Sequence, residues 1–344
     1  MEHIHLAKVA TAIMSGFLLI ACQTTSEPPV SSLDATSSGR IFFESSNTQE
    51  LRDESGNTAE LREPVVVSGK LDFPYSASGR KAVPAIVTMH GSGGTVINQE
   101  WIRRLNEAGV ATFQIDSFSG RGATDVIANH GGVRTTEMIV DAYKALKLLA
   151  THPNIDSQRI GLMGFSKGGI VTQWALSNRR RHREVSTDLM FALHMPVYPL
   201  CLQYEDFKPT GAPIYIIAGE KDNWTPPKPC FEFVEDLAAN GYPAKIDLIK
   251  DAHHGFDRVE QGVEVVEKAS GILECEWVMK PNGAGPLDSY ERNSGLPAYT
   301  VQETERAFSA CANTIIDVKV GATDKTRETA FSKGLSFIED EFFK

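Results

Sequence analysis

The fold of this chain is decided by the stretch Gly164-Phe165-Ser166-Lys167-Gly168-Gly169. It follows the apolar run 159–163, which is typical of a buried strand, and it has the Gly-x-Ser-x-Gly form in which a strand turns sharply into a helix. Glycines flank the serine because a side chain there would clash in so tight a turn. The turn lifts the Ser166 hydroxyl above the sheet and points the Lys167 N–H toward a developing oxyanion. Ser166 is therefore the candidate nucleophile, although the pattern alone also fits a plain glycine-rich turn.

A second glycine-rich loop lies upstream of that turn. Residues 82–89 predict a short buried strand, which runs into His90-Gly91-Ser92-Gly93-Gly94. Loops of this form supply the second backbone donor of an oxyanion hole. We expect the N–H groups of Ser92 and Lys167 to form that hole together.

An acid and a base follow two further predicted strands. Residues 213–219 end in Glu220-Lys221-Asp222, and residues 245–249 lead to Asp251-Ala252-His253-His254. The chain order Ser, Asp, His is that of α/β-hydrolases, and groups that follow parallel strands meet at the carboxyl edge of one sheet. The predicted triad is Ser166, Asp222 and His254. Asp251 and His253 stay open as rivals for the acid and the base.

Several of these segments occur together in one known family. Segments 89–94, 113–122, 164–169, 219–226 and 252–256 resemble the dienelactone hydrolase family of α/β-hydrolases, and the likeness runs from Val65 to the C-terminus. It implies an α/β fold with a mostly parallel sheet, and a hydrolase that cleaves carboxylic esters or lactones. The family pattern Ala-His-x-Phe places the base two residues before Phe256, which favours His254. The best-known members have a cysteine nucleophile where this chain has Ser166.

The same resemblance suggests where a substrate carboxylate would bind. Members that act on dienelactone hold it with two arginines, and Arg121 and Arg258 occupy those places here. A guanidinium fits a carboxylate well. In the alternative, Arg121 pairs with Asp116 or Asp125, and Arg258 pairs with surface acids. Trp224 either lines the acyl pocket or belongs to the core.

Composition describes a globular catalytic chain and limits its partners. Of 344 residues, 42% are hydrophobic and 23% are charged, and the formal net charge is −10. These proportions suit one α/β-hydrolase domain over residues 61–344. The acidic balance argues against nucleic acid, and the sequence has no cofactor fingerprint or metal-ligand spacing. We expect a small-molecule ester as substrate, with no cofactor and no metal; the sequence does not indicate an oligomeric state.

The remaining periodicity completes the predicted scaffold. Helices are expected over 136–150, 231–240 and 325–343, and a strand over 190–199. The basic run 179–183 is interpreted as a solvated loop or helix terminus. Strands that alternate with helices predict a mostly parallel sheet with helices on both faces.

The N-terminus predicts a targeting segment. The apolar run 9–20 is too short to span a membrane and closes in Leu19-Ile20-Ala21-Cys22, which resembles a bacterial lipobox. The resemblance implies a signal peptide over 1–21 and a lipid on Cys22. With Gln23 next, we expect a lipid anchor in the outer membrane of the bacterial cell envelope, facing the periplasm; a secreted protein is the alternative. Residues 22–60 are predicted to be the lipidated cysteine and a flexible tether.

Four cysteines remain after Cys22. In an oxidising compartment an even number predicts disulfides. Cys201 and Cys230 each follow a predicted strand end, so we pair them, and this leaves Cys275 with Cys311.

Overall fold

The computed structural model describes residues 28–74, 82–95, 97–127, 130–260, 262–270, 276–280, 288–311 and 315–344. Along the chain its strands are β1 Gly39–Arg52, β2 Thr58–Asp72, β3 Val83–Met89, β4 Ala111–Asp116, β5 Ile155–Phe165, β6 His194–Val197, β7 Gln203–Tyr204, β8 Ile214–Gly219, β9 Ala244–Ile249, β10 Gly262–Ser270, β11 Trp277–Lys280, β12 Asp288–Glu291 and β13 Ile315–Ala322. The helices are α1 Gln99–Glu107, α2 Thr135–Leu149, α3 Lys167–Trp174, α4 Asn178–Glu184, α5 Lys228–Ala239, α6 Val301–Cys311 and α7 Asp324–Phe343, with a 3-10 turn at Ser119–Arg121.

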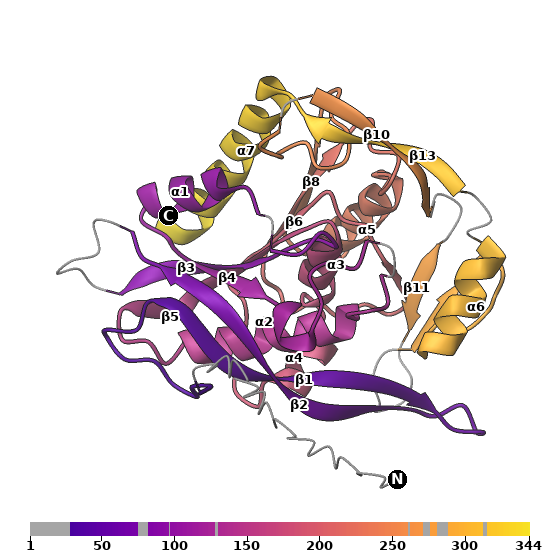
Figure 1. Ribbon diagram of the computed structural model, residues 1–344, viewed down its shortest axis with the longest axis horizontal. Coiled ribbons are helices and arrows are strands. Elements are labelled where there is room, and N and C mark those ends of the chain that lie inside the picture. The colour runs from indigo at the N-terminus through magenta and orange to yellow at the C-terminus, as the bar shows by residue number, and fades with distance from the viewer. Residues whose placement is uncertain are drawn as a thin grey trace, which may run out of the picture.

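An eight-stranded sheet forms the centre of the molecule (Figure 1). Its order is β1-β2-β4-β3-β5-β6-β8-β9. The strands from β4 to β9 in that order run parallel, whereas β2 is antiparallel to β4 and β1 is antiparallel to β2. The predicted α/β fold with a mostly parallel sheet is confirmed.

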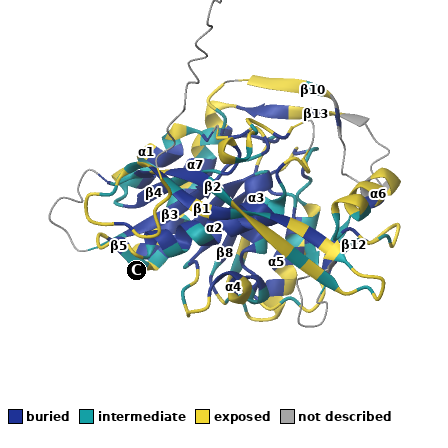
Figure 2. Cartoon of the chain, turned by 60° about the horizontal axis from the view of Figure 1, so that its bottom comes forward, coloured by how far each residue is buried: buried dark blue, intermediate teal, exposed yellow. Residues whose placement is uncertain are grey.

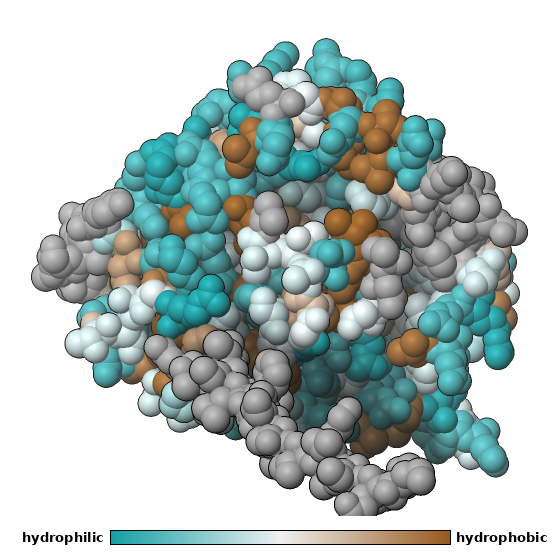
Figure 3. Space-filling model, viewed as in Figure 1, coloured by the Kyte–Doolittle hydropathy of each residue, from teal (hydrophilic) through white to brown (hydrophobic). Residues whose placement is uncertain are grey.

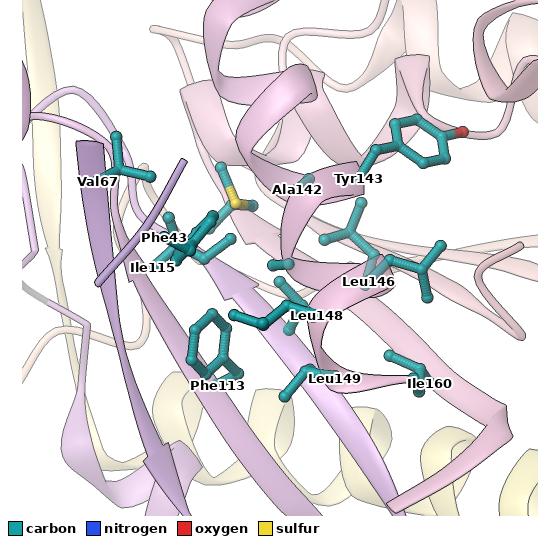
Figure 4. Packing of buried hydrophobic residues seen from close by; sticks show 14 of the residues in the cluster. Phe43, Val67, Phe113, Ile115, Ala142, Tyr143, Leu146, Leu148, Leu149 and Ile160 are labelled. Carbon is teal, nitrogen blue, oxygen red and sulfur yellow. The ribbon is translucent and has the colours of Figure 1, made fainter. Parts of the chain in front are cut away.

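Helices cover both faces of this sheet because its central strands are apolar on both sides. In β8, Ile214 and Ile216 belong to the apolar cluster that includes Phe233 of α5, while Tyr215 and Ile217 belong to the cluster that includes Phe331 of α7. This is the period of two expected of a strand whose successive side chains point to opposite faces. Figure 4 shows the third cluster, in which α2 packs on the sheet through Ala142 and Leu146, among others.

The N-terminal strand extends the sheet, so the prediction of a flexible tether over 22–60 is wrong for most of that range. β1 pairs with β2 from Gly39 to Arg52, and it buries Ile41 and Phe43, which are 7% and 2% exposed. The alternation of these two side chains is a strand signal that the Ser- and Thr-rich composition concealed. The predicted signal peptide and Cys22 lie outside the described residues.

The basic run 179–183 is solvated only in part: His182 and Arg183 are exposed, whereas two of its arginines are buried. It lies inside α4, and Arg180 and Arg181 are only 4% and 7% exposed. The Arg180 guanidinium lies 3.0 Å from Glu60 of β2 and 3.0 Å from Glu184. Buried charges need such partners. The pair between Arg180 and Glu60 connects α4 to the β1–β2 hairpin.

Between the turn after β9 and the last helix, the chain forms an addition at the carboxyl edge of the sheet. β10 pairs antiparallel with β13, and β11 pairs with β12 and β7. β12 is a short strand of four residues within this addition. Figure 2 shows that β10 is largely exposed and that β13 is partly buried.

The surface of the molecule is mixed. In the view of Figure 3, apolar residues form small groups among hydrophilic ones. Within the part of the chain that the structure describes, no helix combines the length and apolar character that crossing a bilayer requires.

Candidate active site

Ser166 lies in the turn between β5 and α3, as predicted. Its φ is 51°, which residues with side chains seldom adopt. The turn is possible because backbones approach closely: a Cβ on Gly164 would lie 2.0 Å from the oxygen of Gly168, and a Cβ on Gly168 would lie 2.2 Å from the oxygen of Met89. Only glycine fits at these two positions, so β3, β5 and α3 meet directly beneath the serine.

Hydrogen bonds join Ser166, His254 and Asp222 in one chain. Nδ1 of His254 lies 2.8 Å from Oδ2 of Asp222, and Nε2 lies 3.0 Å from Oγ of Ser166. Asp222 follows β8 and His254 follows β9, so both reach the carboxyl edge of the sheet where Ser166 sits. This is the arrangement of nucleophile, base and orienting acid that activates a serine hydroxyl.

Asp222 is held in its ionised form. Its carboxylate accepts hydrogen bonds from the N–H groups of Trp224 and Thr225, each at 2.9 Å, and from Oγ1 of Thr225 at 2.9 Å. Burial alone would raise the pKa of Asp222, but the His254 charge and these hydrogen bonds bring the pKa below its ordinary value. A charged Asp222 can stabilise the imidazolium that forms when His254 takes a proton.

The two rivals for these roles make their contacts elsewhere. Nδ1 of His253 lies 3.0 Å from the oxygen of Lys221. Asp251 is exposed and forms an ion pair with the Lys221 ammonium. The geometry therefore favours His254 and Asp222, the residues that the sequence singled out.

The two expected oxyanion donors flank the nucleophile. A Cβ on Gly91 would lie 3.3 Å from Cβ of Ser166, so the loop that carries Ser92 passes beside the serine. Lys167 is the first residue of α3, where an N–H has no acceptor within the helix. Ser92 and Lys167 thus lie in segments next to Ser166, and the role of their N–H groups toward an oxyanion stays a prediction.

The side chains of Ser92 and Lys167 both form hydrogen bonds with His130. Oγ of Ser92 lies 2.8 Å from Nδ1 of His130, and the Lys167 ammonium donates to the carbonyl oxygen of His130. Lys167 is only 6% exposed. Burial lowers the pKa of Lys167 to about 8, and the charge of Glu137 partly opposes this shift. The position of Lys167 in the Gly-x-Ser-x-Gly motif did not suggest that its ammonium would be buried and bonded to a neutral carbonyl.

Arg121 does not serve as a free carboxylate receptor. Its guanidinium forms a double hydrogen bond with Asp141, at 2.8 and 2.9 Å, and further bonds to Asn47, Ser46 and Ser117. The two side chains of the ion pair are 5% and 0% exposed. The predicted substrate role of Arg121 is therefore wrong, and its partner is neither of the two carboxylates named in the alternative.

Arg258 is also engaged, as its alternative interpretation expected. Its guanidinium lies 2.7 Å from Glu264 of β10 and its side chain is 41% exposed. This places it in a surface ion pair rather than in a substrate site.

Trp224 contacts both the catalytic imidazole and an apolar cluster. Its ring centroid is 5.1 Å from that of His254, and the ring also packs on an apolar cluster of the addition that contains Ala269, Val318 and Val320. The role of Trp224 toward an acyl group stays a prediction.

The β10–β13 ribbon is bonded to the turns that carry the acid and the base. The N–H of Gly321 donates to the oxygen of His254 at 2.9 Å. The side-chain amide of Asn223 donates to the oxygen of Asp317 and accepts from the N–H of Lys319, each at 3.0 Å. β13 thus positions residues that precede it by more than sixty positions, a link with no sequence signal.

Cys201 and Cys230 form the predicted disulfide, with a Cα–Cα distance of 5.0 Å. It joins the segment after β6 to the start of α5 and so flanks the turn of Asp222. Cys275 lies outside the described residues, so the second pairing, with Cys311, stays a prediction. The described residues hold no group of three or more His, Cys, Asp or Glu side chains suited to a metal ion.

Comparison with known proteins identifies relatives of this site. The model of the family described as "Dienelactone hydrolase family" matches residues 74–273, which is more than half of the chain and includes all three triad positions. Among curated proteins, none matches the chain significantly.

Solved structures with a similar arrangement include an esterase of Thermogutta terrifontis with butyrate bound. It is 16% identical, with a TM-score of 0.46 over 57% of this chain and 82% of that chain. The same esterase phosphonylated by sarin is 16% identical, with a TM-score of 0.45 over 57% and 83%. A putative dienelactone hydrolase of Klebsiella pneumoniae subsp. pneumoniae MGH 78578 is 17% identical, with a TM-score of 0.43 over 62% and 88%.

Proposed function

The chain belongs to the dienelactone hydrolase family, and we propose that it is a serine hydrolase that cleaves carboxylic esters or lactones through an acyl-serine intermediate. The observation that carries this proposal is the unbroken hydrogen-bonded chain from Ser166 through His254 to Asp222. A serine hydroxyl becomes an effective nucleophile only when a base takes its proton during attack.

In the first half of the reaction, Oγ of Ser166 bonds to the ester carbonyl carbon as its proton passes to Nε2 of His254. The carbonyl oxygen gains negative charge and is held by the N–H groups of Ser92 and Lys167, each of which contributes about 3–4 kcal/mol. When the tetrahedral intermediate collapses, the C–O bond to the alcohol breaks, and Nε2 gives its proton to the leaving oxygen.

In the second half, water takes the place of the alcohol. His254 removes a proton from the water, whose oxygen attacks the acyl carbon. The acid product leaves as Oγ of Ser166 recovers its proton from Nε2. Asp222 keeps its negative charge throughout and stabilises the imidazolium in both halves.

The test is covalent labelling of the mature chain with a fluorophosphonate, followed by assays with short aryl esters, lactones and peptides. Ser166→Ala should abolish labelling and ester cleavage. His254→Ala should lose as much activity as Ser166→Ala, because members of a triad act as a unit. His253→Ala is the matched control, since the neighbouring imidazole bonds only to Lys221 in the described contacts, and it should stay near wild type.

Other outcomes would identify a different chemistry. Cleavage of peptides but not esters would indicate a peptidase, and transfer of the acyl group to an added alcohol in preference to water would indicate an acyltransferase. A chain that neither labels nor turns over would be an inactive envelope scaffold, a role that does not require all three triad residues.

We also propose that the mature protein is anchored in the bacterial cell envelope by a lipid on Cys22 and faces the periplasm, with the membrane as its partner. The sequence Leu19-Ile20-Ala21-Cys22 supports this proposal, and so does the disulfide, because such bonds persist in oxidising compartments. Incorporation of labelled fatty acid in a bacterial host, lost in Cys22→Ala, would support the anchor. A wild-type chain that takes up no lipid and is recovered unattached would overturn it.

A further inference from the structure

Tyr198 contacts the catalytic imidazole although no sequence motif marks it. It follows β6 directly, and its ring centroid lies 4.9 Å from that of His254, with 62° between the ring planes. Its ring also lies 5.0 Å from that of Phe256, at 88°. The Tyr198 side chain thus contacts two residues of the turn that carries the base.

The backbone of Tyr198 is in an uncommon conformation. Its φ is 38°, in a region that a bulky residue enters only when its surroundings hold it there, and such residues cluster at functional sites. Its N–H donates to Ile217 of β8 at 2.7 Å, and its carbonyl oxygen accepts from Oγ1 of Thr225 at 3.2 Å. Thr225 also bonds Asp222, so Tyr198 touches the turn of the acid as well as the turn of the base.

A buried carboxyl group anchors the Tyr198 hydroxyl. The hydroxyl donates to Oδ1 of Asp257 at 2.7 Å, and Nε1 of Trp101 donates to Oδ2 at 2.7 Å. Asp257 is 2% exposed, and burial raises its pKa despite these hydrogen bonds. Burying a carboxyl group is unfavourable unless it is hydrogen-bonded in this way. The described hydrogen bonds to the Asp257 side chain come from Tyr198 and Trp101.

We propose that Tyr198 is a positioning residue for the catalytic base, an inference that rests on the proposed roles of Ser166 and His254. The hydrogen bond to Asp222 fixes one atom of the imidazole but leaves the ring free to rock about it. Contact with the rings of Tyr198 and Trp224 restrains that motion, so that Nε2 stays within 3.0 Å of Oγ of Ser166. Asp257 holds Tyr198 in turn.

The first test is Tyr198→Leu, which removes both the ring and the hydroxyl. Misplacing a catalytic group by a small distance costs about 100-fold in rate, so we expect kcat to fall by about that factor while KM changes less than about threefold. The far-downfield proton resonance of the bond between Nδ1 of His254 and Asp222 should broaden or vanish. Tyr198→Phe keeps the ring but frees it from Asp257, and it should lower kcat about tenfold.

Tyr215 offers a matched control on the neighbouring strand. It is 2% exposed, and its hydroxyl donates to a carboxylate, Asp247, at the same 2.7 Å, but its ring packs on Phe337. Tyr215→Leu should lose stability yet keep kcat within about threefold of wild type and retain the downfield resonance.

Unchanged kcat and resonance in Tyr198→Phe would overturn the proposal, as would a loss of kcat in Tyr215→Leu equal to that in Tyr198→Leu. If Tyr198→Leu does not fold, Tyr198→Phe decides the question. The resonance is measured without substrate. A wild-type chain that cleaved no ester would therefore end the proposed function while the positioning of His254 could still be tested.

Discussion

At the scale of single residues, the buried cations of Lys167 and Arg121 differ in the groups to which they donate hydrogen bonds. The Lys167 ammonium is buried and donates to a neutral carbonyl, whereas every nitrogen of the Arg121 guanidinium donates to the protein. The sequence does not distinguish these arrangements. A lysine or arginine close to a catalytic motif can either bind substrate or stabilise a loop, and the residue type is the same in both cases. The partners in the fold determine the role.

Lys167 should reduce stability at neutral pH. Its pKa is 10.5 in an unfolded chain and about 8 in the fold, so below pH 8 the fold bears the full cost of burying the charge. Between pH 8 and 10.5 the unfolded chain binds more protons than the folded one, and stability should rise with pH. We predict that Lys167→Met raises the free energy of unfolding at pH 7 by about 1–3 kcal/mol, after the lost hydrogen bond is counted.

Urea denaturation across this pH range measures the effect. The gain from Lys167→Met should shrink as the pH passes through 8, whereas Lys325→Met, at an exposed position in the first turn of α7, should leave the pH dependence unchanged. A gain that is constant with pH would mean that the charge of Lys167 is not the cause.

Arg121 should be structural. Removing its side chain leaves Asp141 buried and without its cation, which typically costs about 3–5 kcal/mol of stability. We predict that Arg121→Ala unfolds at lower denaturant and loses activity equally on an anionic ester and on a neutral ester of the same size. Arg258→Ala, in an exposed pair, should cost less than about 1 kcal/mol. A loss confined to the anionic ester would restore the substrate role of Arg121.

At the scale of elements, short sequence patterns predicted correctly those strands, turns and helices that depend on contacts between residues close in the sequence. The strand, turn and helix around Ser166 were predictable because Gly164 and Gly168 report the close backbone approach that the turn requires. β1 was not, because its Ser, Thr and Glu residues resemble a linker until pairing with β2 fixes which side chains face the core. β6 starts at His194, later than the predicted 190–199, and it ends at Val197 because the chain turns at Tyr198, whose φ is positive.

The disulfide joins two elements on either side of the acid. Cys201 and Cys230 are 29 positions apart, and a bridge over a loop of that size contributes about 2–4 kcal/mol. We predict that the double variant Cys201→Ala, Cys230→Ala loses this amount of stability in chemical denaturation. A thiol reductant should destabilise the wild type by more than it destabilises the double variant, which retains only the predicted Cys275–Cys311 bridge. Equal sensitivity of both proteins to the reductant would show that this bridge is not the stabilising bond.

At the scale of the whole molecule, the site depends on contacts between distant parts of the chain. Tyr198 reaches Asp257 across 59 positions, and Asn223 reaches Lys319 across 96. Sequence motifs identify the catalytic residues, because the reaction requires particular residue types at those positions. The residues that hold them in place are set by packing, which no short pattern records.

The N-terminal strand should be part of the folded unit rather than a dispensable leader. Phe43 is buried and its ring lies 5.8 Å from that of Phe113. We predict that Phe43→Ala lowers the free energy of unfolding by about 3–5 kcal/mol. Leu51→Ala, on the same strand but 36% exposed, should cost less than about 1 kcal/mol. If Phe43→Ala and Leu51→Ala both had negligible effects in chemical denaturation, this segment would be a flexible tether after all.

The bond between β13 and the turn of His254 has a consequence for biosynthesis. A ribosome releases Ser166, Asp222 and His254 well before it completes residues 315–344, which supply β13 and α7. Until that last segment docks, the carbonyl of His254 and the side chain of Asn223 lack their partners on β13. A nascent or prematurely terminated chain would therefore contain the full triad and still be silent, so that reactivity appears only when synthesis is finished.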